Sequence, residues 1–509
     1  MQTLLKKLNK FNVKIDLVDK KIVIQAPKGI MTEDLLNEIK LHKNDLIEFI
    51  TLYKAKENEY TFIPVVPEQT SYTLSSSQRR LWLLSLFEEG NIAYNTPSVF
   101  ELKGDVKIFS LQSAFQSLIE RHESLRTVFK EDETGEVKQV ILNHEEIKFQ
   151  LQYEDVSDEE NWLKKTRLII QNEASYKFDL SVDYLLRAKL VKTSKETYIF
   201  ICVMHHIISD GWSAEVMTNE LFTLYEAYAK GNVNPLPALQ LQYKDYAAWQ
   251  QDQLKNNSIE DHKSYWLQQF EGELPILDLP THQPRPAIKT YIGKSVNKFY
   301  DKSLFEDFND LCQSQASTLF MGLLATVKVL LYKYTNQKDI IIGSPIAGRQ
   351  HSDLQNQIGF YVNTLALRTQ FDGKDNFKQL LLNVKEVTLG GHEHQVYPFD
   401  ELVEQLPLKR DMSRNPLFDT IITLQNSDEF KKNKPKIESL EISEFEFKED
   451  ITSRFDLEFG FIEFEKGLSL IITYNKDIYD QNFIEGMLRH FSRLLEQIII
   501  NPSLSISQL

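Results

Sequence analysis

The segment that decides the fold reads Met204-His205-His206-Ile207-Ile208-Ser209-Asp210-Gly211-Trp212-Ser213, directly after Tyr198-Ile199-Phe200-Ile201-Cys202-Val203. The residues before Met204 form an almost continuous apolar run, which is typical of a strand buried on both faces of a sheet. Successive side chains of a strand point to opposite faces, so His205 and His206 are expected to point in opposite directions. We therefore predict one structural histidine and one that faces a site.

Helical and strand patterns alternate on both sides of this segment. In the first half of the chain they predict helices at 111–122, 161–178 and 215–230, and strands at 137–142 and 198–204. A second series of the same kind contains a long apolar helical region at 305–334 and a buried strand at 339–343. Two α/β halves of comparable size predict a two-lobed enzyme of the mixed α/β (α+β) class, with its site in the cleft between the lobes.

The first 57 residues differ in charge from the rest of the chain. They contain eleven lysines against eight acidic residues, whereas the whole chain has a net charge of −15. Apolar spacing predicts a helix at 4–11, a hairpin around Val18-Asp19-Lys20 and helical residues after Thr32. Pro64 and Pro67 mark a linker. We predict a small module at 1–57, a linker at 58–73, a first lobe at 74–254 and a second lobe at 255–509.

Composition excludes several classes of function. The 58 Lys and Arg residues against 73 Asp and Glu residues argue against nucleic acid as the main partner. The apolar runs are shorter than the ~18 residues that a membrane span needs, so we predict no membrane segment. The N-terminus lacks the pattern of a secretory signal. Two cysteines, Cys202 and Cys312, indicate a reducing cytoplasm and no disulfide framework.

The paired histidines carry the densest reactive chemistry of the chain. Neighbouring histidines that point apart are poor chelators and no third ligand stands at a familiar spacing, so we predict no metal. A strand-to-helix turn, with Asp210 as N-cap and Gly211 at positive φ, would be the purely structural explanation. An imidazole with a pKa near ~6.5 can take a proton from an amine or alcohol. The sequence lacks a Gly-x-Ser-x-Gly elbow, which favours direct transfer without a covalent enzyme intermediate.

The pattern His205-His206-x-x-x-Asp210-Gly211 resembles the signature of nonribosomal peptide synthetase condensation domains, which are relatives of chloramphenicol acetyltransferase. Further segments resemble the other family motifs in order, over about 430 residues, and lie at 74–82, 121–129, 243–249, 358–368, 394–399 and 410–418. Ser77 stands where the first motif more often has Ala.

The resemblance implies two chloramphenicol acetyltransferase-like lobes in a V with a central tunnel. Donor and acceptor thioesters arrive on the phosphopantetheine arms of two carrier proteins, and the chain binds no cofactor of its own. The acceptor amine attacks the donor carbonyl and an amide forms. The family would place His206 in the tunnel as the catalytic residue, by removing a proton, orienting the amine or stabilising the tetrahedral species.

Four further residues support this active site by the same resemblance. Asp210 would pair with Arg349, in Gly343-Ser344-Pro345-Ile346-Ala347-Gly348-Arg349, and both would be architectural. His205 would be structural, and the backbone N–H of Gly211 would be a candidate oxyanion donor.

The N-terminal module resembles the TubC-type docking domains that begin some synthetase subunits. Such modules bind the C-terminal tail of the preceding subunit, and strand addition to a hairpin edge would suit this role. Lys20 and Lys21 are the candidate docking residues for an acidic tail. Alternatively, these lysines only protect the edge of a hairpin.

Subtype and alternatives follow from the motifs. Epimerisation domains share the histidines, but the fifth and seventh motifs are similar to those of domains that join an L-configured donor to an L-configured acceptor. The intact His205 and His206 argue against a heterocyclisation domain, and a docking domain argues against a starter domain. The chain ends about where the family continues into an adenylation domain, so we expect that domain downstream. A catalytically silent module that recruits carrier proteins or tailoring enzymes, and acyl transfer to a soluble amine, remain alternatives.

Overall fold

The computed structural model describes residues 14–18, 21–25, 62–409, 411–426, 437, 439–445 and 451–509. The chain divides into two units, Met1–Pro64 and Val65–Leu509. In the first unit, strands β1 (Lys14–Val18) and β2 (Lys21–Gln25) pair antiparallel, with Ile15 opposite Ile24, which confirms the predicted hairpin. The predicted helices of this unit and Lys20 lie outside the described residues, and for Lys21 only the backbone is described.

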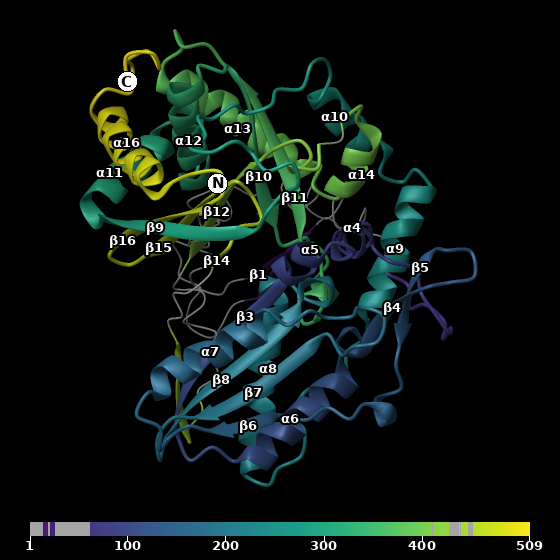
Figure 1. Ribbon diagram of the computed structural model, residues 1–509. Helices are drawn as coiled ribbons and strands as arrows, with labels where there is room; N and C mark the ends of the chain where they lie inside the picture. Colours follow the sequence, from purple (N-terminus) through teal and green to yellow (C-terminus); the bar gives the residue numbers. More distant parts are fainter. Residues whose placement is uncertain are drawn as a thin grey trace. The chain divides into compact units, whose positions relative to one another are not determined.

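The first sheet of the second unit has the strand order β13-β3-β8-β7-β6. Its strands are β3 (Asn95–Gly104), β6 (Gln152–Asp155), β7 (Leu186–Lys192), β8 (Thr197–His205) and β13 (Leu440–Glu444). Strand β8 is central, and every residue from Tyr198 to His205 is buried, as the apolar run predicts. The strand therefore lies within the first core and ends at His205, directly before His206. Figure 1 shows β8 between β3 and β7.

Helices cover this sheet through apolar faces. They are α6 (Ile108–Arg121), α7 (Trp162–Ala174) and α8 (Gly211–Ala229), and α7 contacts β3 and β8 while α6 packs on α8. In α6 the buried residues are Leu111, Ala114, Phe115, Leu118 and Ile119. This spacing of three and four places them on one side of the helix, where they join the first hydrophobic core.

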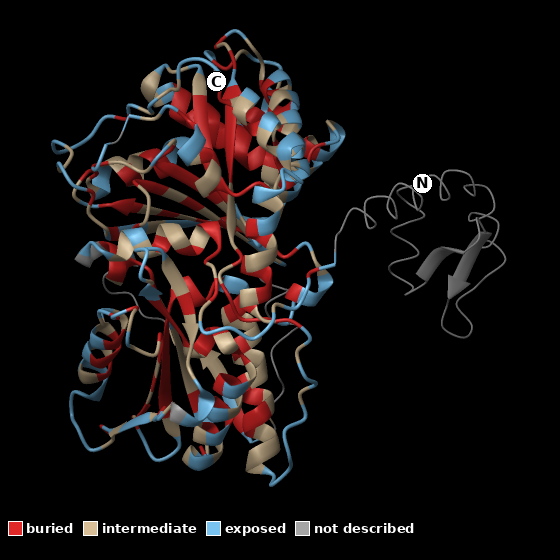
Figure 2. Ribbon diagram, turned by 90° about the vertical axis from the view of Figure 1, so that its right-hand side faces the viewer, coloured by how far each residue is buried: buried red, intermediate tan, exposed pale blue. Residues whose placement is uncertain are grey.

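The second sheet has the order β11-β10-β12-β15-β16-β9-β14. Its strands are β9 (Ile292–Asp301), β10 (Asp339–Ile346), β11 (Asn363–Gln370), β12 (Thr420–Asn426), β14 (Ile451–Thr452), β15 (Leu457–Phe464) and β16 (Gly467–Asn475). The helices that pack with it are α11 (Lys302–Ser314), α12 (Leu319–Thr335), α13 (Phe377–Glu393) and α16 (Gln481–Ile500). Their shared core is separate from that of the first sheet, and Figure 2 shows buried residues following the strands and the inner helix faces.

The remaining elements are short or connect the two sheets. They are α4 (Ser76–Ser85), α5 (Glu88–Ala93), α9 (Tyr243–Lys255), α10 (Glu260–Gln269), α14 (Phe399–Gln405), the hairpin β4 (Thr127–Glu131) and β5 (Val137–Ile141), and the 3₁₀ turns η1 (Glu123–Arg126), η2 (His144–Glu146), η3 (His206–Ile208) and η4 (Ser352–Leu354).

One expectation from periodicity is wrong. The predicted helical region 305–334 consists of two helices, α11 and α12, that meet at 100°. Ala316 between them has φ +50°, and Thr318 accepts the N–H of Met321 as the N-cap of α12. Among the described residues, no single helix is long and apolar enough to cross a membrane, and only this bent pair meets that test jointly.

Strand β13 joins the first sheet although it lies far along the second half of the sequence. Its residues pair antiparallel with β3, with Leu440 opposite Gly104. Gly104 has φ +130°, and a Cβ on it would lie 2.6 Å from the carbonyl oxygen of Ser439. Only glycine suits this close approach, so the second half of the chain is tied to the first sheet at a specific position.

Candidate active site

His205 lies at the buried end of strand β8. Its side chain has no exposed surface, and its Nδ1 accepts the N–H of Ile207 at 3.2 Å. The ring packs edge-on against Phe178, with 6.1 Å between the centroids. Burial, followed by the charge of His206, lowers the pKa of His205 to about 3. His205 is therefore a neutral, packed side chain.

His206 begins the 3₁₀ turn η3 and keeps part of its surface exposed. Its ring lies between Tyr94 and Phe360, at centroid distances of 6.2 and 4.8 Å. Its Nδ1 lies 2.5 Å from the carbonyl oxygen of Ser209. Because a carbonyl oxygen can only accept, Nδ1 carries the proton and the neutral ring leaves Nε2 as an acceptor.

The electrostatic surroundings of His206 keep the ring neutral. Burial, and next the positive charge of Arg454, lower the pKa of His206 to about 3. The backbone N–H of His206 donates to the carbonyl oxygen of Tyr94 at 2.8 Å, which fixes the start of the turn. At neutral pH the site therefore offers an unprotonated imidazole nitrogen held in one tautomer.

Asp210 and Arg349 connect the two halves of the second unit. Arg349 Nη2 lies 3.1 Å from Asp210 Oδ1, with at most 1% of either side chain exposed. The other Asp210 oxygen accepts the N–H of Tyr361 at 2.9 Å. Asp210 is also the N-cap of α8, because its Oδ1 accepts the N–H of Ser213 at 2.7 Å. One carboxylate thus joins the N-terminus of α8 to both Arg349 and the backbone of Tyr361.

The segment 348–361 lies against the N-terminus of α8. Arg349 also donates to Ser213 Oγ at 2.6 Å and to the carbonyl oxygen of Gln357 at 2.8 Å. Gly348, which has φ +65°, starts this segment where a Cβ would lie 2.0 Å from the carbonyl oxygen of Tyr361. The segment places Phe360 against His206.

Gly211 is the first residue of α8 and is exposed. Its φ is not positive, so the turn does not require glycine for conformational reasons. A Cβ added to Gly211 would meet no atom within 4 Å. The space that a Cβ would occupy, at the positive end of the helix dipole, is therefore free of protein atoms.

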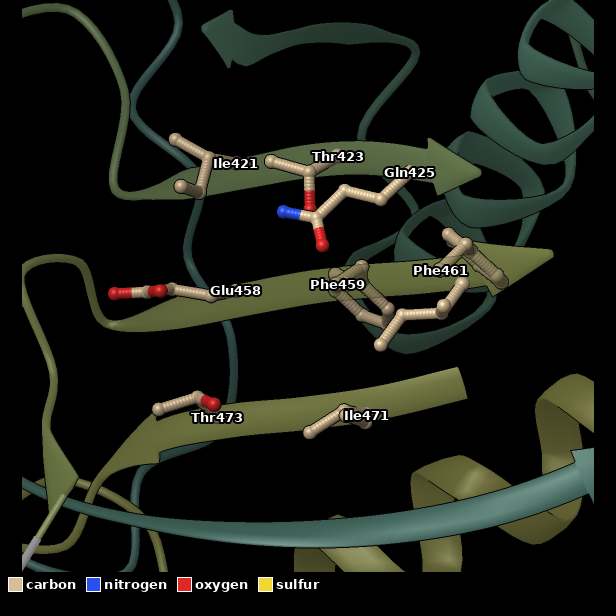
Figure 3. A pocket seen from close by; sticks show the side chains of 10 residues that line it. Ile421, Thr423, Gln425, Glu458, Phe459, Phe461, Ile471 and Thr473 are labelled. Carbon is tan, nitrogen blue, oxygen red and sulfur yellow. The ribbon is translucent and has the colours of Figure 1, made fainter. Parts of the chain in front are cut away.

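An open hollow lies on the face of the second sheet formed by β12, β15 and β16, as Figure 3 shows. It has an empty volume of about 540 Å³ and is lined by Ile421, Thr423, Gln425, Glu458, Phe459, Gly460, Phe461, Ile462, Ile471 and Thr473. Glu458 is the charged side chain of this lining, and burial raises its pKa. The hollow contains no metal-binding group of three or more His, Cys, Asp or Glu side chains, nor does any other part of the described chain.

Sequence reasoning did not identify three neighbours of His206: Tyr94, Phe360 and Arg454. Phe360 lies in a segment that resembles the fifth family motif, which was a usable signal. Tyr94 and Arg454 carry no local signal, because each approaches His206 from another part of the chain. The docking candidates Lys20 and Lys21 have no described side chains.

Comparison with known families identifies the two parts of the chain. The model of the Condensation domain matches residues 68–509. The chain belongs to the condensation domain family. Members of this family in nonribosomal peptide synthetases are peptide-bond-forming acyltransferases. The model of the TubC N-terminal docking domain matches residues 1–51. The predicted segment boundaries at 57, 73 and 254 stay predictions.

Curated relatives are components of peptide synthetases. This condensation domain chain is 40% identical, over 89% of its length, to a linear gramicidin synthase subunit of Brevibacillus parabrevis. It is also 40% identical, over 87% of its length, to a plipastatin synthase subunit of Bacillus subtilis. Gramicidin S synthase 2 of Brevibacillus brevis is 38% identical over 89%. The chain spans only 6% of the length of the linear gramicidin synthase subunit, 17% of that of the plipastatin synthase subunit and 10% of that of gramicidin S synthase 2.

Solved structures share the fold of this condensation domain. The X-domain from teicoplanin biosynthesis matches with a TM-score of 0.81 and 23% identity, covering 88% of this chain and 99% of that one. The condensation domain from the monacolin K polyketide synthase MokA matches with a TM-score of 0.73 and 19% identity, covering 87% and 100%. The predicted mixed α/β, chloramphenicol acetyltransferase-like fold class is confirmed.

Proposed function

We propose that this condensation domain joins two carrier-bound substrates through an amide bond. The acceptor amine attacks the carbonyl carbon of the donor thioester, the C–S bond breaks, and the amine proton passes to the departing thiolate. The observation that carries the proposal is the 2.5 Å contact between the carbonyl oxygen of Ser209 and Nδ1 of His206. This Nδ1 donates to Ser209, so the neutral Nε2 can accept a hydrogen bond or a proton from the amine.

His206 is the proposed catalytic residue, and His205 is its structural neighbour. An amine that arrives protonated cannot attack. A neutral imidazole can orient the lone pair of the neutral amine, or take its proton as the new C–N bond forms. His205 cannot share this role, because its ring is fully buried and its Nδ1 is already occupied by Ile207. The two histidines therefore divide into packing and chemistry.

The N-terminus of α8 is the proposed oxyanion site. As the carbonyl carbon becomes tetrahedral, negative charge develops on its oxygen. The Gly211 N–H lies at the start of a 19-residue helix, and no protein atom would fill the space of a Cβ there. Asp210 and Arg349 hold this helix start against the segment 348–361, and we assign them an architectural role.

The proposed partners follow from family membership and from the relatives, which are synthase subunits. We propose that both substrates arrive on phosphopantetheine arms of carrier proteins through a tunnel between the lobes, and that the domain binds no cofactor of its own. The proposed stereochemistry is L-configured donor to L-configured acceptor. We further propose a cytoplasmic location, an adenylation domain downstream, and a docking domain that uses Lys20 and Lys21 to bind the C-terminal tail of the preceding synthetase protein.

An intact-mass assay of dipeptidyl transfer between two loaded carrier proteins tests this function. We expect His206→Ala to lower the transfer rate by ~10²-fold or more while the protein stays folded and carrier binding is unchanged. His206→Gln is a matched variant that keeps polarity without basicity.

Two results would contradict the proposal. Equal transfer by wild type and His206→Ala would remove His206 from the chemistry. A wild type that binds loaded carriers but transfers nothing with several matched donors and acceptors would instead favour the silent recruitment module.

A further inference from the structure

We propose that Arg454 is a positioning residue for His206. Arg454 holds the backbone next to the imidazole, and it brings a permanent positive charge to the site from the second half of the chain. This inference rests on the proposed function, because it concerns the group assigned to the chemistry. Arg454 lies between the short strand β14 and strand β15, about 250 residues after His206 in the sequence.

The backbone of Arg454 is held by charged side chains on both sides. Glu458 Oε1 accepts the N–H of Arg454 at 2.9 Å and the N–H of Phe455 at 3.3 Å. Lys289 Nζ donates to the carbonyl oxygen of Arg454 at 2.6 Å, and Lys289 is only 9% exposed. Charge-assisted hydrogen bonds of this kind are stronger than neutral ones, so the position of Arg454 is well determined.

The side chain of Arg454 reaches the corner that precedes β3. Its Nε donates to the carbonyl oxygen of Ala93 at 3.1 Å, and its guanidinium carbon lies 5.2 Å from the centroid of the Tyr94 ring. The next carbonyl along the chain, that of Tyr94, accepts the N–H of His206 at 2.8 Å. Arg454 and His206 therefore bind two consecutive peptide groups of one corner.

The charged groups that face His206 are Arg454 and Arg80, while its neighbour His205 is neutral. Arg80, on α4, is paired with Asp400 at 3.2 Å. Arg454 takes part in none of the ion pairs of the described residues, and its two terminal nitrogens have no hydrogen-bond partner there. The nearby acid, Glu458, binds backbone N–H groups rather than the guanidinium. The less compensated charge beside His206 is thus that of Arg454.

This charge favours the neutral form of the imidazole. A positive charge on His206 would be repelled by the guanidinium of Arg454. The hydrogen bond from Nδ1 to Ser209 fixes which nitrogen keeps its proton, and Arg454 disfavours the protonation of the other. The two contacts together keep Nε2 ready for the acceptor amine.

Histidine-labelled protein allows a test that does not depend on activity. The signals of His206 are assigned with His206→Gln, and the protonated fraction of the ring at pH 5 is measured by NMR in wild type, Arg454→Gln and Arg454→Lys. Arg454→Gln removes the charge and retains a donor for Ala93. We expect it to raise the protonated fraction about tenfold, which corresponds to one pKa unit, and we expect Arg454→Lys to restore the wild-type value. The exposed Arg489 supplies the control Arg489→Gln, which should change nothing.

Transfer kinetics provide the second measurement. We expect Arg454→Met, which loses the donor to Ala93, to lower kcat about tenfold with little change in the KM for the loaded acceptor carrier, and Arg454→Lys to recover part of the loss. An unchanged protonated fraction in Arg454→Gln overturns the inference even if transfer is normal. A changed fraction in a protein that transfers nothing supports the role of Arg454 and rejects the proposed function. If Arg454→Gln does not fold, the protonated fraction of His206 is compared between Arg454→Lys and Arg454→Met at the same pH, because the first variant keeps the positive charge and the second removes it.

Discussion

Arg349 Nη2 lies 3.1 Å from Asp210 Oδ1 and 2.6 Å from Ser213 Oγ, so one guanidinium binds both the N-cap and the first turn of α8. The plane of the guanidinium also lies near Tyr361, with 4.1 Å between its carbon and the ring centroid. Tyr361 in turn donates its backbone N–H to Asp210. This closed set of contacts joins segments that lie about 140 residues apart, and it fixes the helix start that carries Gly211.

Breaking the ion pair on one side should destabilise the fold strongly. In Asp210→Asn or Arg349→Met one buried charge loses its partner, so we expect the free energy of unfolding to fall by about 3–5 kcal/mol. Chemical denaturation measures the change. The exposed pair Lys302–Glu306 is the control, and Lys302→Ala should cost no more than about 0.5 kcal/mol. A double variant that loses as much as the two single variants combined would contradict this coupling.

Gly211→Ala should separate stability from activity. Its Cβ would meet no protein atom, and alanine favours a helix, so we expect an unfolding free energy equal to that of wild type within about 1 kcal/mol. If the open space is reserved for the reacting carbonyl, transfer should fall about tenfold or more. Gly322→Ala is the contrasting variant, because its Cβ would lie 2.2 Å from Cys312 Sγ and should destabilise the protein. Full transfer activity in Gly211→Ala would place the oxyanion elsewhere.

Lys328 should make stability depend on pH. The side chain is fully buried in α12, and Nζ donates to the carbonyl oxygens of Ile340 and Leu367 at 2.8 and 2.9 Å. A neutral amine has two N–H donors, which these two carbonyls satisfy. Burial lowers the pKa of Lys328 from 10.5 to about 7.

The direction of this pH dependence follows from the number of protons that the folded and unfolded states bind. Between pH 7 and 10.5 the unfolded chain holds a proton on Lys328 that the folded protein does not, so this contribution to stability rises with pH in that window. We expect the free energy of unfolding of wild type, measured relative to Lys328→Met, to increase by about 1.5 kcal/mol between pH 7 and pH 8.5. Urea denaturation at the two pH values measures it. A constant difference would mean that Lys328 stays charged in the core.

His205 and His206 should respond differently to removal of the ring. His205→Ala leaves a cavity beside Phe178 and frees the Ile207 N–H, so we expect a loss of about 2–4 kcal/mol of unfolding free energy. His206→Ala removes a partly exposed ring and should cost clearly less. Thermal unfolding of both variants distinguishes them. Equal losses would contradict the division into a packing and a reacting histidine.

Local patterns in the sequence predicted much of the fold. The apolar run at 198–203 became the buried strand β8, and the helices predicted at 111–122 and 215–230 became α6 and α8, within a few residues. These predictions succeed because burial follows the repeat of one element. The break between α11 and α12 has no such signature, because apolar residues recur at helical spacing in both helices and only the backbone at Ala316 and the cap at Thr318 separate them.

The sequence by itself determined several of the helices and strands, the family motifs and the pair of histidines at the end of β8, since each depends on residues that are close in the chain. The tertiary structure decided which histidine is buried, that β13 joins the sheet of β3, and that Phe360 and Arg454 surround His206. The physical reason is that these relations depend on contacts between distant segments. Such contacts form only when the two cores pack and bring residues 93–94, 206, 349–361 and 454 together.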